Sequence, residues 1–278
     1  MKIWSYAVAW NEEKMLEFYL RHYSKFCDKM IFFDNESDDN SHEIINSYPN
    51  TEIRPYHTGG KFDDNVHMDL KHFAIGDAAG NCDYAIIGDC DEFIHHPNLT
   101  EFLKSHLWKT AIFYPAGYQM ASHEFPNNNT QIYDSIKNGA PSPWYSKPIL
   151  INPNMLQEFK WVGGQHEIDL ESKYSGEIYH PIPVSVRPVG EYEGNQWGKW
   201  KIMDHLLHIF KKEPLKLLHY KFIGTEYVTH RHRQYIHRNS EFNIENNKGG
   251  HYIESDTFEK TYYEIQEIIN KSDYLDLN

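Results

Sequence analysis

The sequence has few cysteines, no long apolar run and no excess of basic residues. Its three cysteines, Cys27, Cys82 and Cys90, are odd in number and lack metal-binding spacing, so we expect reduced thiols in a cytoplasmic protein. No apolar stretch approaches the roughly 20 residues that a membrane-spanning helix needs. The first residues turn acidic too soon for a signal peptide. The net charge of −13 disfavours broad binding to nucleic acid or to anionic lipid.

Two common nucleotide-binding motifs are also missing. There is no P-loop, and no G-x-G-x-x-G follows the first expected strand, which argues against a kinase or a dehydrogenase. The chain instead has 40% hydrophobic and 15% aromatic residues, a composition typical of a folded globule. Aromatic rings can hold sugars or bases, but we expect most of these to fill the core. A length of 278 residues allows one substantial core.

Apolar runs alternate with helical patterns over the first hundred residues. The expected strands cover 2–10, 29–33, 51–56 and 83–88, and the expected helices cover 11–26, 42–48 and 63–80. This alternation predicts an α/β fold with a mostly parallel, Rossmann-like sheet flanked by helices. Ligands of such sheets bind at the carboxyl ends of the strands, where Asn11, Asp34 and Asp89 are expected. Asn11 is also the expected cap of the first helix.

The second half has a weaker pattern. Strands are expected at 110–120 and 147–152, a loop-rich stretch at 180–200, and closing helices at 225–243 and 256–271. Asp256 and Glu259 would form a capping-box-like pair at the start of the last helix.

The stretch "YAIIGDCDEF" at 84–93 ends an apolar strand in three carboxylates. Asp89 and Asp91 are two residues apart, so in an extended strand both face one side while Cys90 turns into the packing. Such crowded carboxylates repel one another unless a cation or a charged ligand lies among them. A carboxylate pair suits Mg²⁺ or Mn²⁺, which would bring a phosphate with it. A helix cap or a solvated turn is the alternative.

Five ordered motifs carry a resemblance to a known family. They are "VAWNEEKMLEFYLRHY", "IFFDNESDDNS", "DYAIIGDCDEFI", "SKPILINPNMLQEFKWVGGQHE" and "LLHYKFIGTEYVTHRHR". Together they resemble the GT-A-fold, nucleotide-sugar-dependent glycosyltransferases of the family-2-like and family-92-like group found in capsule and lipopolysaccharide loci. The resemblance implies a glycosyltransferase domain over 1–225, with a nucleotide-sugar-binding half at 1–110 and an acceptor-side half at 111–225. A C-terminal helical extension would follow at 226–278.

The resemblance also implies a metal site. Asp91 would bind the metal directly, Asp89 would contact the ribose or take part in the metal site through a bound water, and His219 would complete it. An imidazole beside two carboxylates favours Mn²⁺ over Mg²⁺. Asp34 would hold the uracil or the ribose. The alternative for His219 is a packed core histidine, and Asp34 and its neighbours could be ordinary turn residues.

Further residues are candidates for the diphosphate and for catalysis. By the same resemblance Lys147 and Lys221 would hold the diphosphate, and Asn11 would lie in the nucleotide-sugar site. His166, Glu167 and Asp169 follow two glycines that permit close backbone approach, and Glu167 is the first choice for a general base. A polar turn is the alternative.

These features predict a metal-dependent hexosyltransferase of surface polysaccharide biosynthesis, in the cytoplasm or at the inner face of the cytoplasmic membrane. Its partners would be a UDP-sugar donor and a saccharide or lipid-linked glycan acceptor, with no nucleic acid. The resemblance implies inversion at the anomeric carbon, although retention stays open. A nucleotidyltransferase and a non-catalytic carbohydrate-binding module are the alternatives.

A basic stretch at 230–238, "HRHRQYIHR", stands out in this acidic chain. On a helix, Arg231 and Arg238 share a face with Tyr235. That face would meet an anion, or its arginines would pair with carboxylates of the same chain.

Overall fold

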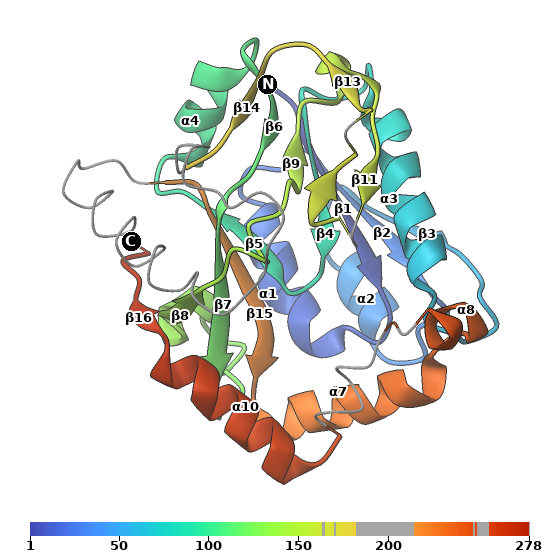
Figure 1. Cartoon of the computed structure of the whole chain (residues 1–278), viewed down its shortest axis with the longest axis vertical. Coiled ribbons are helices and arrows are strands. Elements are labelled where there is room, and N and C mark those ends of the chain that lie inside the picture. The colour runs from blue at the N-terminus through green and yellow to red at the C-terminus, as the bar shows by residue number, and fades with distance from the viewer. Residues whose placement is uncertain (163–164, 170, 182–213, 247, 249–255, 278) are drawn as a thin grey trace.

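A seven-stranded sheet forms the larger half of the computed structural model (Figure 1). The structure describes residues 1–162, 165–169, 171–181, 214–246, 248 and 256–277. The strand order is β3-β2-β1-β4-β9-β6-β14. The strands are β1 (Ile3–Ala9), β2 (Lys29–Asp34), β3 (Thr51–Pro55), β4 (Tyr84–Asp89), β6 (Thr110–Phe113), β9 (Leu150–Ile151) and β14 (Glu177–Tyr179).

The first four of these strands are parallel, and their carboxyl ends meet at one edge. Ala9 of β1 pairs with Asp34 of β2, and Val8 pairs with Asp89 of β4. The short β9 runs antiparallel between β4 and β6. The helices beside this part of the chain are α1 (Glu13–Tyr23), α2 (Ser41–Asn46), α3 (Asp64–Ala78) and α4 (Leu99–His106). The predicted α/β architecture, a mostly parallel sheet flanked by helices, is confirmed.

A second sheet of five strands has the order β16-β8-β7-β15-β5. Its strands are β5 (Glu92–His95), β7 (Ala116–Ser122), β8 (Asn138–Pro141), β15 (Lys216–Ile223) and β16 (Asp273–Tyr274). The predicted strand at 110–120 is therefore two strands, β6 and β7, one in each sheet, with Pro115 between them. In the same way β4 lies in the first sheet and β5 in the second, so the acidic turn at 89–91 crosses from one sheet to the other.

Shorter elements complete the described chain. They are α5 (Ile132–Ser135), η1 (Pro153–Met155), α8 (Glu241–Glu245) and two antiparallel two-stranded sheets, of β10 (Leu156–Glu158) with β13 (Lys173–Tyr174) and of β11 (Trp161–Val162) with β12 (Glu167–Ile168). The predicted strand at 147–152 is reduced to β9, and all but the first two residues of the predicted loop at 180–200 fall outside the described residues.

The helix-cap predictions are wrong. Asn11 has a positive φ of 51° and its amide bonds to Asp38, so it cannot cap α1. Instead Asp39 accepts a hydrogen bond from the backbone N–H of Glu13 at 3.1 Å, across the gap between the ends of β1 and β2. In the last helix, α10 (Phe258–Asn270), the capping residue is Thr257, whose side chain accepts from the N–H of Lys260.

The predicted helix at 225–243 is divided into α7 (Thr225–Arg238) and α8. Ser240 caps α8 by accepting from the N–H of Asn243, which ends the first helix and starts the second. Helix α10 packs against α7 and against β7 and β8 (Figure 1). The division of the chain at residue 225 stays a prediction.

The core follows the predicted apolar faces. Two apolar clusters fill the two sides of the first sheet, and the larger extends under the second. Cys27, Cys82 and Cys90 are buried and form no disulfide. Over the described residues no helix has both the length and the apolar character to cross a bilayer.

Candidate functional site

A cavity of about 1100 Å³ lies at the carboxyl ends of β1, β2 and β4. Its walls come from the end of β1, from α3, from the acidic turn, from β15 and from α7. The charged lining residues are Glu12, Asp64, Asp69, Asp89, Asp91 and Glu264 on the acidic side, and Lys71, Lys147, Lys221, Arg231, Arg238 and Lys248 on the basic side. Six acidic and six basic side chains balance here, whereas the whole chain has a net charge of −13. The cavity lining is therefore less acidic on balance than the chain as a whole.

The acidic turn is held by two lysines. Lys71 of α3 places its ammonium 2.9 Å from one oxygen of Asp89, and Lys147 lies 3.8 Å from the other. Lys147 also forms an ion pair with Glu92, whose side chain is only 1% exposed. The second Glu92 oxygen accepts the backbone N–H of Asp89 at 3.1 Å. The carboxylates are thus tied into one network with cations from other parts of the chain.

This network changes the expectation that the carboxylates at 89–92 need a bound cation. Burial by itself raises the pKa of Asp89, but Lys71 and Lys147 lower it more, so the net pKa lies below the usual value. The attraction of Glu92 and Asp89 likewise outweighs burial and raises the pKa of Lys147. The expectation that a bound cation must neutralise all three carboxylates is wrong for Asp89 and Glu92, because the chain provides those cations.

Asp91 has a different environment. Its side chain lies 3.4 Å from Nε2 of His219 on β15, and no lysine or arginine of the described chain reaches it within ion-pair distance. Burial raises the pKa of Asp91, but the neighbouring His219 lowers it to a net value below the usual one. His219 is 6% exposed and packs on the ring of Tyr145 at 4.2 Å between centroids. It is both a packed histidine and part of the cavity wall.

The Asp91 and His219 pair fits a divalent cation. Ligands bound at about 2.1 Å in an octahedral site lie roughly 3 Å apart, close to the observed 3.4 Å. The predicted third ligand, Asp89, is bound to lysines instead, and the described residues contain no cluster of three or more potential metal-ligating side chains. The pair could hold a metal only together with ligand or water oxygens.

Of the residues predicted to hold the diphosphate or to act as the base, some line the cavity and others do not. Lys147, Lys221 and His166 line the cavity, and burial lowers the pKa of Lys221 despite the opposing charge of Asp91. Glu167 is exposed on β12 and does not line the cavity, and Asp169 caps a turn by accepting the N–H of Glu171. The placement of Glu167 and Asp169 gives no support to their predicted catalytic role.

The hydrogen bonds of His166 define which of its ring nitrogens carries the proton. Its Nδ1 donates to the carbonyl oxygen of Trp144, and the two rings stack at 4.0 Å between centroids. Burial and the charge of Lys147 lower the pKa of His166 to about 3, so the imidazole is neutral at pH 7. Nε2 is then the hydrogen-bond acceptor of this ring.

The other two predicted nucleotide residues lie behind the cavity wall. Asp34 is 1% exposed, and one oxygen is bound by His42 at 2.9 Å and by the N–H of Ser37. Asn11 bonds to Asp38 through its amide. Neither lines the cavity, whereas Asn35, next to Asp34, does.

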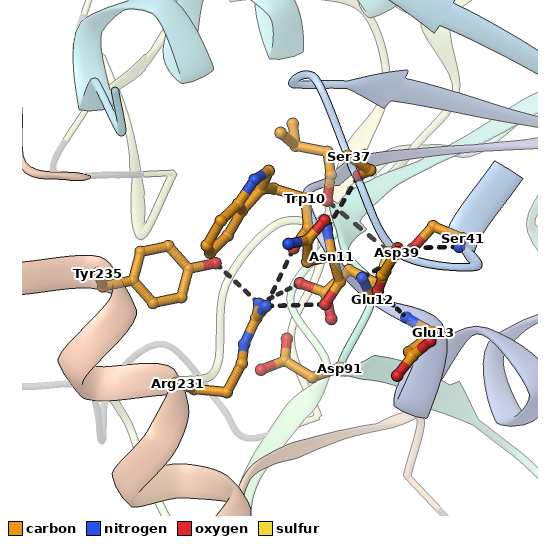
Figure 2. Close-up of polar contacts among 12 residues, drawn as sticks. Trp10, Asn11, Glu12, Glu13, Ser37, Asp39, Ser41, Asp91, Arg231 and Tyr235 are labelled. Carbon is orange, nitrogen blue, oxygen red and sulfur yellow. Dashed lines mark hydrogen bonds and ion pairs between the residues drawn. The ribbon is translucent and has the colours of Figure 1, made fainter. Parts of the chain in front are cut away.

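Arg231 of α7 reaches the end of β1, where most of its guanidinium donors form hydrogen bonds within the chain (Figure 2). Its guanidinium donates to the carbonyl oxygens of Trp10 and Asn11 at 3.0 and 2.9 Å, to the Glu12 carboxylate, and to the Tyr235 hydroxyl. For Arg231 the second alternative, pairing within the chain, is confirmed.

The sequence reasoning missed Lys71, Glu12 and Trp10. Lys71 lies on a helix whose pattern carries no local sign of a buried lysine. Glu12 lies three residues after the end of β1, so its position near a strand end was a usable signal. It is buried, and this raises its pKa to about 7 although Arg231 lowers it.

Comparisons with known proteins give only distant matches. No family model and no curated sequence matches the chain. Among solved structures, glucosyl-3-phosphoglycerate synthase from Mycobacterium tuberculosis, in complex with Mn²⁺, UDP and glucosyl-3-phosphoglycerate, is 16% identical over 42% of this chain, with a TM-score of 0.29. The match spans 44% of that enzyme, less than half its length. A 4-diphosphocytidyl-2C-methyl-D-erythritol synthase from Anaerococcus prevotii is 12% identical over 55% of this chain and 70% of its own, with a TM-score of 0.31.

Proposed function

We propose that the protein is a metal-dependent glycosyltransferase of the GT-A type that uses a UDP-sugar. One observation carries the proposal. Asp91 and His219 lie together in a charge-balanced cavity at the carboxyl ends of parallel strands, within a chain of net charge −13. A parallel sheet binds nucleotides at this edge. A divalent ion with a diphosphate is the ligand that a carboxylate, an imidazole and several cations would hold together.

Mn²⁺, or Mg²⁺, would be held by Asp91 and His219. When bound, such an ion neutralises charge that develops on a departing diphosphate. Lys147 and Lys221 would add fixed positive charge on the same side, and their position on the wall supports that role. Asp89 holds Lys71 and Lys147 in place, so its contribution would be to position these cations.

The acceptor would bind on the side of the cavity formed by Trp144 and His166. Trp144 lines the cavity and is 45% exposed, so its ring offers an apolar face to a saccharide. His166 accepts through Nε2 and would orient the attacking hydroxyl, in place of Glu167. The acceptor would be a saccharide or a lipid-linked glycan, and we retain inversion as the stereochemical outcome. The reaction would take place in the cytoplasm or at the inner face of the cytoplasmic membrane.

Nucleotide binding with and without metal tests the proposal. UDP should raise the melting temperature in the presence of Mn²⁺ and much less in EDTA, because the diphosphate and Asp91 repel each other without a bridging cation. A panel of UDP-sugars should then release UDP slowly by hydrolysis. Release of pyrophosphate from UTP or CTP would instead favour a nucleotidyltransferase, and equal stabilisation by UDP in EDTA would refute the metal-bridged site.

A further inference from the structure

Arg238, the last residue of α7, is a buried cation on the cavity wall. It is 8% exposed, and its Nε donates to the carbonyl oxygen of Gly60 at 2.9 Å. The guanidinium carbon lies 3.4 Å from the centre of the Trp10 ring. Its Nη2 is buried and has no hydrogen-bond partner in the part of the chain that the structure describes.

Arg231 and Arg238 contact the same Trp10 ring but differ in how they are satisfied. Arg231 donates to three oxygens of the chain at the end of β1 and to Tyr235. Arg238 donates to the Gly60 carbonyl oxygen through Nε, and a guanidinium keeps its charge at any physiological pH. A buried charged donor without an acceptor is unfavourable, so a ligand oxygen at Nη2 would remove that energetic cost.

The surroundings of Arg238 are aromatic. Tyr235 packs edge-on against both Trp10 and Phe62, at 5.8 and 5.2 Å between ring centroids. All three line the cavity with Arg238. Aromatic side chains beside one fixed N–H donor suit an aromatic ligand that carries an oxygen at its edge.

Arg238 lies about two helical turns along α7 from Arg231. Seven residues separate it from Arg231 along α7, a rise of about 10 Å, and Arg231 lies beside the acidic turn near Asp91 (Figure 2). Both guanidinium groups nevertheless contact the same Trp10 ring, so the charged ends of the two side chains lie closer together than this rise. The loop at 58–62 reinforces the site, since Gly60 accepts from Arg238 and Lys61 accepts from Asn35 at the end of β2.

Building on the proposed function, we propose that the Trp10, Phe62, Tyr235 and Arg238 end of the cavity holds the nucleobase, and that Arg238 is a specificity-determining residue that donates from Nη2 to a base carbonyl oxygen. Uracil presents a carbonyl oxygen where cytosine presents an amino group. The fixed donor therefore selects a keto-edged base and disfavours an amino-edged one, because two donors would face each other.

The test is the ratio of the Kd values of CDP and UDP, measured by calorimetry with Mn²⁺ on the parent, Arg238→Gln and Arg238→Lys. The parent should favour UDP by about tenfold or more, and both variants should reduce the ratio towards one. Arg238→Lys keeps the charge and so guards against loss of folding, which the melting temperature monitors. Arg233→Gln is the matched control, because Arg233 lies exposed on the same helix and donates to the Asp256 carbonyl oxygen.

Uridine, measured by competition, separates a base contact from a phosphate contact. A base contact predicts that Arg238→Gln weakens uridine and UDP by similar factors. Weakened UDP with unchanged uridine would overturn the inference in favour of a phosphate contact. An unchanged CDP to UDP ratio in folded variants would also overturn it, as would a parent that binds both equally. If the parent binds no nucleoside diphosphate, the proposed function itself fails, and the inference with it.

Discussion

Two charge-dense stretches face the same cavity, the acidic turn at 89–92 and the basic helix α7. Each is neutralised mainly by groups that are remote in the sequence. Lys71 and Lys147 bind the acidic turn, whereas Glu12 and two backbone carbonyl oxygens bind Arg231. Asp89 and Glu92 in the turn, and Arg231 on α7, are therefore neutralised by contacts within the fold.

Each of the two regions also keeps one charged group that the fold does not fully satisfy. Asp91 has a histidine but no lysine or arginine partner among the described residues, and Arg238 has an unused Nη2 donor. A high density of charged residues in the sequence therefore identifies ligand-binding residues poorly. Charged groups that lack a full set of partners in the folded chain identify them better. The following experiments break or sharpen this comparison.

Removing a neutralising cation should have the largest effect. Lys147→Met leaves Glu92, at 1% exposure, without its ion-pair partner, and breaking a buried pair in this way costs about 3–5 kcal/mol of unfolding free energy. Urea denaturation measures it. The control is Lys104→Met, whose pair with Glu101 is exposed and should contribute less than about 1 kcal/mol. A loss as small as the control would mean that the fold does not depend on this ion pair.

Removing the Asp91 carboxylate should change UDP binding far more than it changes stability. Asp91→Asn is expected to weaken Mn²⁺-dependent UDP binding about a hundredfold, or roughly 2.7 kcal/mol, with only a slight fall in the unliganded melting temperature from the loss of the His219 contact. Asp89→Asn should lower the melting temperature more strongly, since the buried Lys71 loses its carboxylate partner. Calorimetry and thermal denaturation on both variants separate the two roles. Equal stability losses in the two variants would contradict the distinction.

The last prediction concerns the dependence of stability on pH. Burial raises the pKa of Glu12 from about 4.5 to about 7, so between these values the folded state binds a proton that the unfolded state has released. The contribution of Glu12 to stability is therefore complete below pH 4.5 and is lost as the pH rises through 7. Glu12→Gln should flatten this part of the stability profile, followed by denaturation from pH 4.5 to 8. A profile that keeps the same slope in the variant would show that other groups cause it.

Much of the first half of the fold could be predicted because its signals are local. Apolar runs and helical periodicity within 2–88 located four strands and three helices, and the carboxyl ends of those strands follow from parallel pairing. Cys90 is buried between two cavity-lining aspartates as predicted, but β4 ends at Asp89, so the three residues form a turn and not the extended strand expected from the sequence. The caps of α1 and α10 were mispredicted because α1 is capped from a neighbouring loop and because the start of α10 shifts by one residue.

The sequence by itself determined the α/β class, the acidic strand end and the set of titratable residues available to a site. Only the tertiary structure decided that Lys71 neutralises Asp89, that His219 rather than Asp89 accompanies Asp91, and that His166 rather than Glu167 lines the cavity. Hydrophobic periodicity is a property of neighbouring residues and can be read along the chain. The partner of a buried charge depends instead on which strands pair and how helices pack over them, and those contacts join residues far apart in the sequence.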